Sequence, residues 1–218
     1  MAKGNPPFSI HQENKLLMAL LERKVDADKW FYSDLNFDQL YPVAIQQLAR
    51  MHWTPLDVAR KAANFLAIKP NVKILDIGSG VGKFCLGAAY YKPDAFYYGT
   101  EQRKNLVYQA DAVKEMLGFE NVAFFHSNFT QLDLRDYDHF YFYNSFYENL
   151  AGTDKIDNSI NYSGELYDYY SRYLCNQLEG MPAGTRLVTF HSLDDEIPHG
   201  YQRVDSGVDD LLKFWIKK

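Results

Sequence analysis

The segment at residues 72–83, V-K-I-L-D-I-G-S-G-V-G-K, carries the strongest chemical signal in the chain, because a strand pattern leads directly into a glycine-rich turn. The residues before the turn are branched and apolar, which is typical of a strand buried on both faces of a parallel sheet; they are Val72, Ile74, Leu75 and Ile77. Gly78, Gly80 and Gly82 then allow the backbone to turn tightly, and they let a ligand lie against main chain where a Cβ atom would clash. The pattern predicts a ligand site at the end of a buried strand.

An acidic residue, Glu101, closes the next short segment, F-Y-Y-G-T-E at residues 96–101. A carboxylate at the end of a second strand can accept hydrogen bonds from both hydroxyl groups of a ribose. The fingerprint of nicotinamide and flavin sites would have glycine where Lys83 stands. A triphosphate-binding loop would have serine or threonine where Phe84 follows that lysine. The sequence therefore indicates a nucleoside ligand of a different kind.

The order of strand, Asp76, G-x-G-x-G, helix, strand and terminal Glu101 resembles motif I and its partner strand in the class I, Rossmann-like S-adenosylmethionine-dependent methyltransferases. The resemblance covers residues 54–215. It implies that S-adenosyl-L-methionine is the cofactor, that Asp76 orders the glycine loop and reaches the methionine amine, and that Glu101 binds the ribose. Gln102 would flank the adenine ring. The cofactor-binding residues that the resemblance implies are Thr54, Asp76, Gly78, Ser79, Gly80, Gly82, Glu101, Gln102, Asn128 and Phe129.

Asn128 follows the third expected strand, in the segment H-S-N-F at residues 126–129. Members of the family often carry an acidic residue here, which accepts a hydrogen bond from the adenine amino group. The side-chain oxygen of Asn128 can accept in the same way, and the amide of Phe129 can donate to the ring. Alternatively, Asn128 caps a short helix over residues 129–134, and the two roles are compatible.

Asn144 ends the fourth expected strand and is the first of two residues expected to act on the methyl acceptor. The segment N-S-F-Y at residues 144–147 is similar to the N-P-P-Y motif of amino-group methyltransferases, in which the asparagine oxygen holds the acceptor nitrogen. The resemblance makes Asn144 and Tyr147 the catalytic residues and Phe146 a pocket wall. Because both prolines are absent, two alternatives stay open: Asn144 as a turn residue that satisfies local backbone, and a non-catalytic adenosyl-binding protein with the methyltransferase fold.

These residues leave the methyl acceptor open between a protein side chain and a small amine or hydroxyl compound. Methyl transfer needs mainly positioning, because the sulfonium already carries an activated methyl group. The glycine loop and G-T-E-Q at residues 99–102 also resemble the Rossmann-like histone lysine methyltransferases. Acidic residues near strand ends, Glu148 and residues 194–196, would favour a cationic acceptor or form a solvated loop. His191 can accept a proton or serve a structural role.

The composition sets limits on partners and location. The chain has 218 residues with 23 basic and 28 acidic side chains, a formal net charge of −5. This charge argues against nucleic acid and against an anionic membrane as partners. Cys85, Cys175 and the other ligand types lack metal-site spacing, so no metal is expected. The N-terminus lacks an apolar signal core and no apolar run is long enough to span a membrane, which favours a cytoplasmic protein. The sequence leaves the oligomeric state open, with a monomer as the favoured state.

Helical and extended patterns alternate along the chain, which predicts an α/β fold. The expected architecture has helices on both faces of a mostly parallel seven-stranded sheet with an antiparallel C-terminal strand. Residues 1–53 are expected to form an N-terminal helical extension or lid, with helices at 11–24 and 38–51, and residues 54–218 the cofactor-binding domain. Thr54 is expected to cap the helix that starts with Pro55. Later helices are expected at 83–91, 106–117 and 163–178, and strands at 72–77, 96–101, 122–125, 138–144 and 185–191.

The C-terminal edge of the sheet departs from the family pattern. Only residues 192–200 separate the fifth strand from the sixth, which is too short for a helix with two turns. We expect a loop or a single helical turn there. The last two strands, at 202–204 and 211–216, are expected to pair antiparallel through a turn at 205–207.

Overall fold

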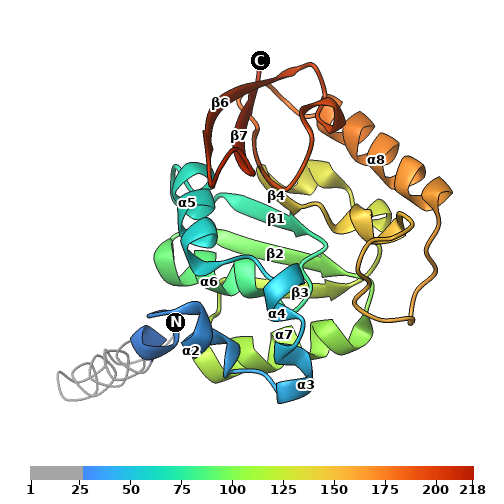
Figure 1. Cartoon of the computed structure of the whole chain (residues 1–218). Helices are drawn as coiled ribbons and strands as arrows, with labels where there is room; N and C mark the ends of the chain where they lie inside the picture. Colours follow the sequence, from blue (N-terminus) through green and yellow to red (C-terminus); the bar gives the residue numbers. More distant parts are fainter. Residues whose placement is uncertain (1–26) are drawn as a thin grey trace, which may run out of the picture.

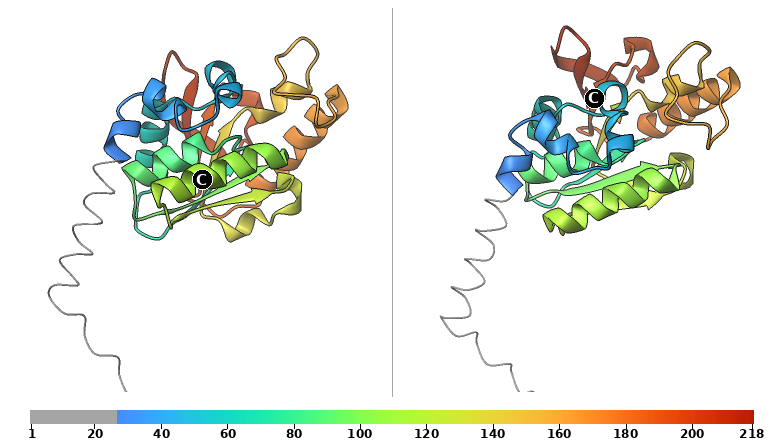
Figure 2. Two further views of the ribbon diagram at one scale, coloured as in Figure 1. Left: turned by 90° about the horizontal axis from the view of Figure 1, so that it is seen from below. Right: turned by 60° about the horizontal axis from the view of Figure 1, so that its bottom comes forward.

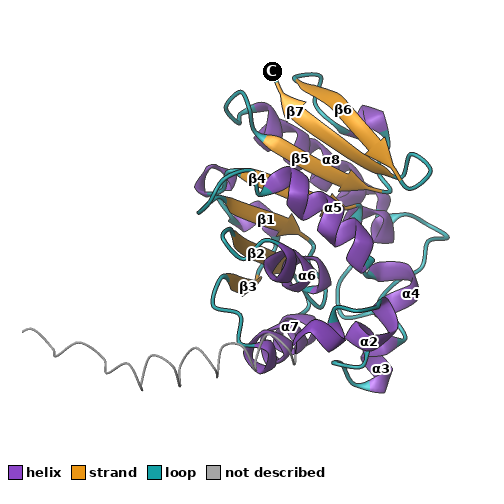
Figure 3. Cartoon of the chain, turned by 90° about the vertical axis from the view of Figure 1, so that its left-hand side faces the viewer, coloured by secondary structure: helices purple, strands orange, loops and turns teal. Residues whose placement is uncertain are grey.

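A single seven-stranded sheet forms the centre of the protein, whose computed structural model describes residues 27–218. The strands are β1 (Lys73–Ile77), β2 (Phe96–Glu101), β3 (Val122–His126), β4 (His139–Tyr143), β5 (Arg186–Phe190), β6 (Tyr201–Gly207) and β7 (Leu212–Lys217). They lie in the order β3-β2-β1-β4-β5-β7-β6 (Figure 3). The first five strands pair in parallel, whereas β7 runs antiparallel to both β5 and β6. The predicted mixed sheet is confirmed.

Apolar residues on both faces of the central strands explain why the sheet is covered on both sides. In β1, Ile74 packs into one core and Leu75 into a second. In β4, Tyr141 packs into the first core and Phe140 into the second. Because successive side chains of a strand point to opposite faces, such an apolar run requires a helical layer on each face.

Four long helices supply these two layers at the positions that the sequence predicted. The helices α5 (Leu56–Leu66), α6 (Lys83–Tyr91) and α7 (Lys104–Leu117) pack on the first core, and α8 (Gly164–Glu179) packs on the second. Gly118 ends α7 with a φ of 71°, a left-handed conformation that glycine adopts readily. Ser163 begins α8 by accepting a hydrogen bond from the N–H of Leu166. None of the described helices combines the length and the apolar composition that crossing a bilayer requires.

Residues 31–55 form three short helices, so the prediction of one helix at 38–51 is wrong. They are α2 (Asp34–Asp38), α3 (Val43–Gln46) and α4 (Ala49–His52). Pro42 interrupts the predicted helix, because proline lacks an N–H and disfavours the helical conformation of the residue before it. Buried rings of Phe37, Tyr41 and Trp53 pack this segment on the first core. Figures 1 and 2 show it on the opposite side of the molecule from α8. The helix predicted at 11–24 lies outside the described residues.

The C-terminal edge follows the predicted pairing with a different turn. The connection from β5 to β6 contains a single turn of 3-10 helix, η4 (Asp194–Glu196), as predicted. The turn predicted at 205–207 is wrong, because Asp205 and Ser206 pair inside β6 with residues of β7. The chain reverses instead at three residues with positive φ, Val208, Asp209 and Asp210.

Candidate active site

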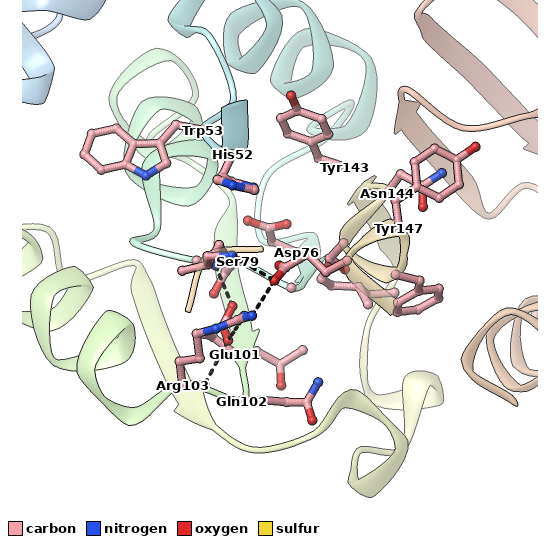
Figure 4. Close-up of a pocket in the computed structure, with 18 of the residues that line it drawn as sticks. His52, Trp53, Asp76, Ser79, Glu101, Gln102, Arg103, Tyr143, Asn144 and Tyr147 are labelled. Carbon is pink, nitrogen blue, oxygen red and sulfur yellow. Dashed lines mark hydrogen bonds and ion pairs between the residues drawn. The ribbon is translucent and has the colours of Figure 1, made fainter. Parts of the chain in front are cut away.

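A cavity of about 710 Å³ opens at the carboxyl ends of β1, β2, β3 and β4 (Figure 4). Parallel strands bring their carboxyl ends to the same edge of a sheet, so the loops that follow them surround one space. The loop after β1 contributes the glycine turn, the last residue of β2 is Glu101, and the loop after β4 contributes Asn144. Residues 50–54 of the N-terminal segment, the segment between β4 and α8, Tyr170 and His191 also contribute to the lining. The edge at which the sequence predicted a ligand is therefore hollow.

The glycine turn presents main chain to this cavity. Gly78 and Gly80 have φ values of 81° and 54°, which favour glycine. The N–H of Gly78 donates to the carbonyl of Thr100 at 3.0 Å, which ties the turn to β2. A Cβ atom added to Gly80 would meet no atom within 4 Å, so the space over this residue is open. The hydroxyl of Ser79 is buried and has no partner within residues 27–218, which makes it a group that a ligand can satisfy.

Gly82 serves packing instead of lining the cavity. Its φ is 82°, and a Cβ atom there would approach the ring of Phe124 to 2.3 Å. Gly82 also precedes the first residue of α6. Close approach of this helix to the sheet accounts for the glycine, and the structure does not bring Gly82 to the ligand as the sequence predicted.

Glu101 lies at the end of β2 with both carboxylate oxygens engaged. Its Oε2 accepts from the N–H of Gly80 at 3.2 Å, and its Oε1 accepts from the N–H of Arg103 at 2.8 Å. The guanidinium of Arg103 lies 3.3 Å from the same Oε1. Burial raises the pKa of Glu101, and Arg103 opposes this shift. Because a carboxylate offers about four lone-pair positions, one remains for a ligand hydroxyl.

Arg103 joins the end of β2 to the segment between β4 and α8. Its Nη2 lies 2.5 Å from Glu148 Oε2 and donates to the hydroxyl of Tyr162 at 2.8 Å. Its Nε lies 3.3 Å from Asp157. Glu148 and Tyr162 both line the cavity. A single buried cation therefore holds one wall of the cavity against the residue predicted to bind ribose.

Asp76 is a buried carboxylate that lines the cavity with no basic partner in the described part of the chain. The thiol of Cys85 donates to its Oδ2 at 3.7 Å. Burial raises the pKa of Asp76 well above its usual value, and the nearby Glu101 adds to this effect. A carboxylate in this condition is stabilised by a cation, and the cavity is where a cationic group can reach it.

Asn128 caps the short 3-10 turn η1 (Phe129–Gln131) and does not line the cavity, although Phe129 does. Its Oδ1 accepts from the N–H and the hydroxyl of Thr130, at 3.0 and 2.9 Å. Its Nδ2 donates to Gln102 Oε1 at 3.0 Å. The oxygen predicted to accept from adenine is therefore occupied by the capping role. Asn128 acts on the cavity indirectly, by orienting the side chain of Gln102.

Thr54 lines the cavity but does not cap α5, so the capping prediction is wrong. Its hydroxyl bonds to the hydroxyl of Tyr141 at 2.9 Å. Pro55 occupies the cap position and provides no side-chain acceptor. Asp34 of α2 supplies it instead, by accepting from the N–H of Leu56 at 3.0 Å. A long-range carboxylate thus replaced the local cap that the sequence pattern favoured.

Asn144 stands at the carboxyl end of β4 and is 6 % exposed. Its Nδ2 donates to the backbone carbonyl of His191 at 3.0 Å and to Glu196 Oε2 at 3.1 Å. Its Oδ1 is buried and has no partner among the residues that the structure describes. Tyr147, in the 3-10 turn η3 (Ser145–Asn149), lies beside it in Figure 4. The two residues predicted to act on the acceptor are therefore together at one end of the cavity.

Aromatic rings line this end of the cavity. The rings of Tyr143 and His191 stack with centroids 5.4 Å apart, and Phe146 stacks on Phe129 at 5.1 Å. The hydroxyl of Tyr143 donates to the carbonyl of Met51, which ties β4 to the N-terminal segment. Burial lowers the pKa of His191, so its imidazole is neutral at pH 7. Flat apolar walls around a polar amide suit a planar acceptor group.

Comparison with known proteins identifies the domain. Residues 68–160 match a family model described as a methyltransferase domain. The chain is 46 % identical over 54 residues to a tRNA (guanine-N(7)-)-methyltransferase of Synechococcus sp. (strain JA-3-3Ab), a match that covers 25 % of this chain and 23 % of that protein. It is 37 % identical over 71 residues to the 23S rRNA (uracil(1939)-C(5))-methyltransferase of Shewanella sediminis (strain HAW-EB3), covering 33 % of this chain and 16 % of that protein. The matches thus span less than a quarter of either relative's length.

The fold of nearly the whole chain is similar to that of solved methyltransferase structures. It is similar to the crystal structure of magnesium protoporphyrin IX methyltransferase from Synechocystis PCC 6803 with bound S-adenosylmethionine. The TM-score is 0.56 at 15 % identity, with 90 % of this chain and 97 % of that chain covered. Residues 68–160 thus match a methyltransferase domain, and the fold around them is that of the class I, Rossmann-like S-adenosylmethionine-dependent methyltransferases. At this low identity the structural likeness itself concerns the fold alone.

The lining of the cavity fits S-adenosyl-L-methionine, the cofactor that the resemblance implied. The open side of Gly80 leaves main chain for the methionine part, and the unpaired carboxylate of Asp76 is placed for an ammonium group. Glu101 keeps an acceptor position for a ribose hydroxyl. The predicted site residues that line the cavity are Thr54, Asp76, Gly78, Ser79, Gly80, Glu101, Gln102, Phe129, Asn144 and Tyr147.

Sequence reasoning missed several residues that line the cavity. They are Arg50, His52, Trp53, Arg103, Tyr143 and Tyr162. Only Arg103 offered a signal, as a cation two positions after the acidic strand end. Within residues 27–218, no three His, Cys, Asp or Glu side chains are grouped so as to hold a metal ion.

The expectation that nucleic acid is not a partner is wrong. Both curated relatives described above are named as RNA methyltransferases, one for tRNA and one for 23S rRNA. The expectation rested on the formal net charge of −5. Net charge describes the long-range field of the whole molecule and does not determine which group enters a cavity.

Proposed function

We propose that the protein is an S-adenosylmethionine-dependent methyltransferase that methylates an exocyclic amino group of a nucleobase in RNA. The observation that carries the proposal is the side-chain amide of Asn144. Its NH2 group is consumed by two acceptors, while its buried oxygen has no partner within the described residues. A buried oxygen without a donor costs free energy until a ligand supplies one.

The unpaired oxygen of Asn144 restricts the kind of acceptor. It can bind only a group that donates a hydrogen bond, such as an amino group. The N7 atom of guanine carries no hydrogen, and C5 of uracil carries only a weakly donating C–H. The exocyclic amino groups of adenine, cytosine and guanine carry two N–H donors each. Among the nucleobase positions, these therefore suit Asn144 best, even though the two curated relatives are named for N7 and C5.

The surroundings of Asn144 support a nucleobase. Tyr143, Phe146 and Tyr147 all line the cavity near this amide, and stacking on aromatic rings is the common way proteins hold an unpaired RNA base. Arg50 also lines the cavity and is exposed, so its guanidinium can meet a phosphate at the entrance. RNA relatives and aromatic walls thus favour the same class of substrate.

Methyl transfer requires the protein mainly to bind the cofactor and to align the acceptor amino group with the methyl group. When bound, S-adenosylmethionine would supply an activated methyl group, and the acceptor amino nitrogen would take this group and give up one proton to water. Asn144 accepts from one N–H and directs the nitrogen lone pair toward the methyl group. Glu101 and Asp76 hold the adenosyl and methionine parts. The aromatic residues exclude water from the space between.

Methyl transfer with labelled cofactor tests the proposal. The protein is incubated with methyl-labelled S-adenosylmethionine and unmodified transcripts of tRNA and 23S rRNA, and a parallel reaction contains RNase-treated cell lysate. Digestion to nucleosides and mass spectrometry should locate the label on an exocyclic amino group. Label on guanine N7, on a carbon atom, or on protein contradicts the proposed acceptor.

Ligand-dependent melting tests the cofactor separately. S-adenosylhomocysteine at a hundred times its dissociation constant should stabilise the protein by about 2.7 kcal/mol. Reduced nicotinamide cofactor serves as the matched control and should leave the melting temperature unchanged. Stabilisation by the nicotinamide and not by the adenosyl ligand contradicts the proposed activity itself.

A further inference from the structure

Glu196 lies in the short connection between β5 and β6, and both of its carboxylate oxygens are engaged. Its Oε2 accepts from the N–H of Leu193 at 2.8 Å and from Asn144 Nδ2 at 3.1 Å. Its Oε1 accepts from the hydroxyl of Tyr167 in α8 at 2.5 Å. Burial raises the pKa of Tyr167, and Glu196 adds to the shift, so the phenol stays a donor at neutral pH. Donors from three parts of the chain therefore fix this carboxylate next to Asn144.

The position of Glu196 decides the orientation of the Asn144 amide. An asparagine amide can be turned over, which exchanges its oxygen and nitrogen. In the observed orientation the NH2 group faces two oxygens, Glu196 Oε2 and the carbonyl of His191. The reversed amide would place Oδ1 against both of these acceptors, which repel it. The bond to Glu196 is charge-assisted and is the stronger kind of the two.

We infer that Glu196 is a positioning residue for methyl transfer, which locks the Asn144 amide with its oxygen available to the acceptor amino group. The inference rests on the proposed function, because it concerns the same oxygen. Glu196 is not among the residues that line the cavity, so it acts through Asn144. The short β5–β6 connection, which replaces the helix expected for the family, is what brings the carboxylate to this place.

Three variants separate the lock from a general structural effect. Glu196→Ala removes the acceptor for Asn144. Glu196→Gln keeps an oxygen for Leu193 and Asn144 and can donate to the Tyr167 oxygen, so it should rescue the lock. Asp195→Ala removes the neighbouring charge, and Asp195 makes no side-chain hydrogen bond or ion pair among the described residues, so it is the matched control.

Two readouts are expected to move together. In side-chain amide NMR, the Asn144 NH2 signals should shift and exchange faster in Glu196→Ala, but stay at their native positions in Glu196→Gln and Asp195→Ala. With the RNA acceptor, kcat should fall about tenfold or more in Glu196→Ala, because misorientation of a positioning group costs on that scale. The dissociation constant of S-adenosylhomocysteine should stay within about twofold of the wild-type value in all three.

The outcomes distinguish this inference from the proposed function. Native Asn144 signals in Glu196→Ala, or a kcat equal to that of Asp195→Ala, overturn the lock even when the wild-type protein methylates RNA. Equal loss of cofactor binding and kcat in Glu196→Ala also overturns it, since that pattern reports a collapsed site. If the wild-type protein transfers no methyl group to RNA, the proposed function fails, and the NMR arm still decides whether Glu196 fixes the amide.

Discussion

Two buried cationic side chains lie near the glycine turn, and they pair with carboxylates from different parts of the protein. Lys83 opens α6 and is 4 % exposed, whereas Arg103 follows β2 and its side chain is 5 % exposed. The carboxylates paired with Lys83 are Asp34 and Asp38, and those paired with Arg103 are Glu101, Glu148 and Asp157. Both aspartates around Lys83 belong to α2 and lie away from the cavity, while Glu101 and Glu148 line it.

The comparison separates docking from ligand binding. Lys83 attaches the N-terminal segment to the helix after the glycine turn, with the rings of Phe37 and Trp53 near its ammonium group. A second contact, from the hydroxyl of Tyr41 to the carbonyl of Val81 at 2.9 Å, supports the same attachment. Arg103 instead neutralises carboxylates that face the ligand. The two cations should therefore respond differently to the same kind of substitution.

Arg103→Met should produce the largest effect. The substitution leaves Glu101 and Glu148 buried without their cation, and an uncompensated buried charge destabilises a protein by about 3–5 kcal/mol. Urea unfolding should show this loss of unfolding free energy. Calorimetry should also show S-adenosylhomocysteine affinity reduced about tenfold or more, since Glu101 loses the partner that holds it. A variant with wild-type stability and wild-type affinity would mean that Arg103 neither stabilises the fold nor positions Glu101.

Lys83→Met is the matched substitution on the other side and should cost less. The side chain of Asp34 is 48 % exposed and can be hydrated, so the expected loss of unfolding free energy is about 1–3 kcal/mol. Lys83 itself lines the cavity, but its ammonium group is paired with Asp34 and Asp38, which do not, so cofactor affinity should change less than about threefold. If Lys83→Met weakens S-adenosylhomocysteine binding as strongly as Arg103→Met does, the division of roles between the two cations is wrong.

The surroundings of these two cations show which features the sequence could predict: local secondary structure, but not long-range ion pairs. The strand, turn and helix around Lys83 follow from local patterns, and α6 and β2 begin and end where the sequence predicted. The lysine itself only argued against other nucleotide fingerprints. Its partners Asp34 and Asp38 lie in a different part of the chain, and no local pattern announces such a pairing. The same limitation applies to Thr54, whose expected cap is supplied by Asp34.

The cavity shows the same division between local and long-range information. Residues of the glycine turn and the ends of β2 and β4 were predictable, because their position follows from strand order and parallel pairing. Asn128 was predicted to bind the ligand, but its Oδ1 accepts the N–H of Thr130 as a helix cap. Glu196 was considered only as part of an acidic loop. Its contact with Asn144 depends on how the β5–β6 connection folds, which composition does not determine.

Asp76→Asn tests a buried carboxylate of the cavity that pairs with neither Lys83 nor Arg103. Burial raises the pKa of Asp76 above its usual 3.8, so the folded state favours the protonated form. The stability that this provides is complete below pH 3.8 and is lost as the pH rises through the raised pKa. At pH 7 the variant should therefore have a larger free energy of unfolding than the wild-type protein, because the amide places no charge in this buried position.

The pH dependence and the ligand complete this test. The stability difference between Asp76→Asn and the wild-type protein should shrink as the pH falls toward 4, when the native carboxyl is itself protonated. Affinity for S-adenosylhomocysteine should fall, because the amide cannot pair with an ammonium group as a carboxylate does. A variant that is less stable at pH 7, or that binds the ligand more tightly, contradicts the assignment of Asp76.

His191→Gly should have the smallest effect, and it addresses the uncharged end of the cavity. His191 has a φ of 58°, and its carbonyl accepts from Asn144. Glycine keeps that carbonyl and removes the left-handed strain, but it loses the stack on Tyr143, so stability should change by less than about 1 kcal/mol. If only the carbonyl matters, kcat for methyl transfer should stay within about threefold of the wild-type value, whereas loss of a proton acceptor would lower it about a hundredfold or more. A fall of that size, together with a wild-type rate that declines as the imidazole is protonated at low pH, would assign the ring a direct part in accepting the proton.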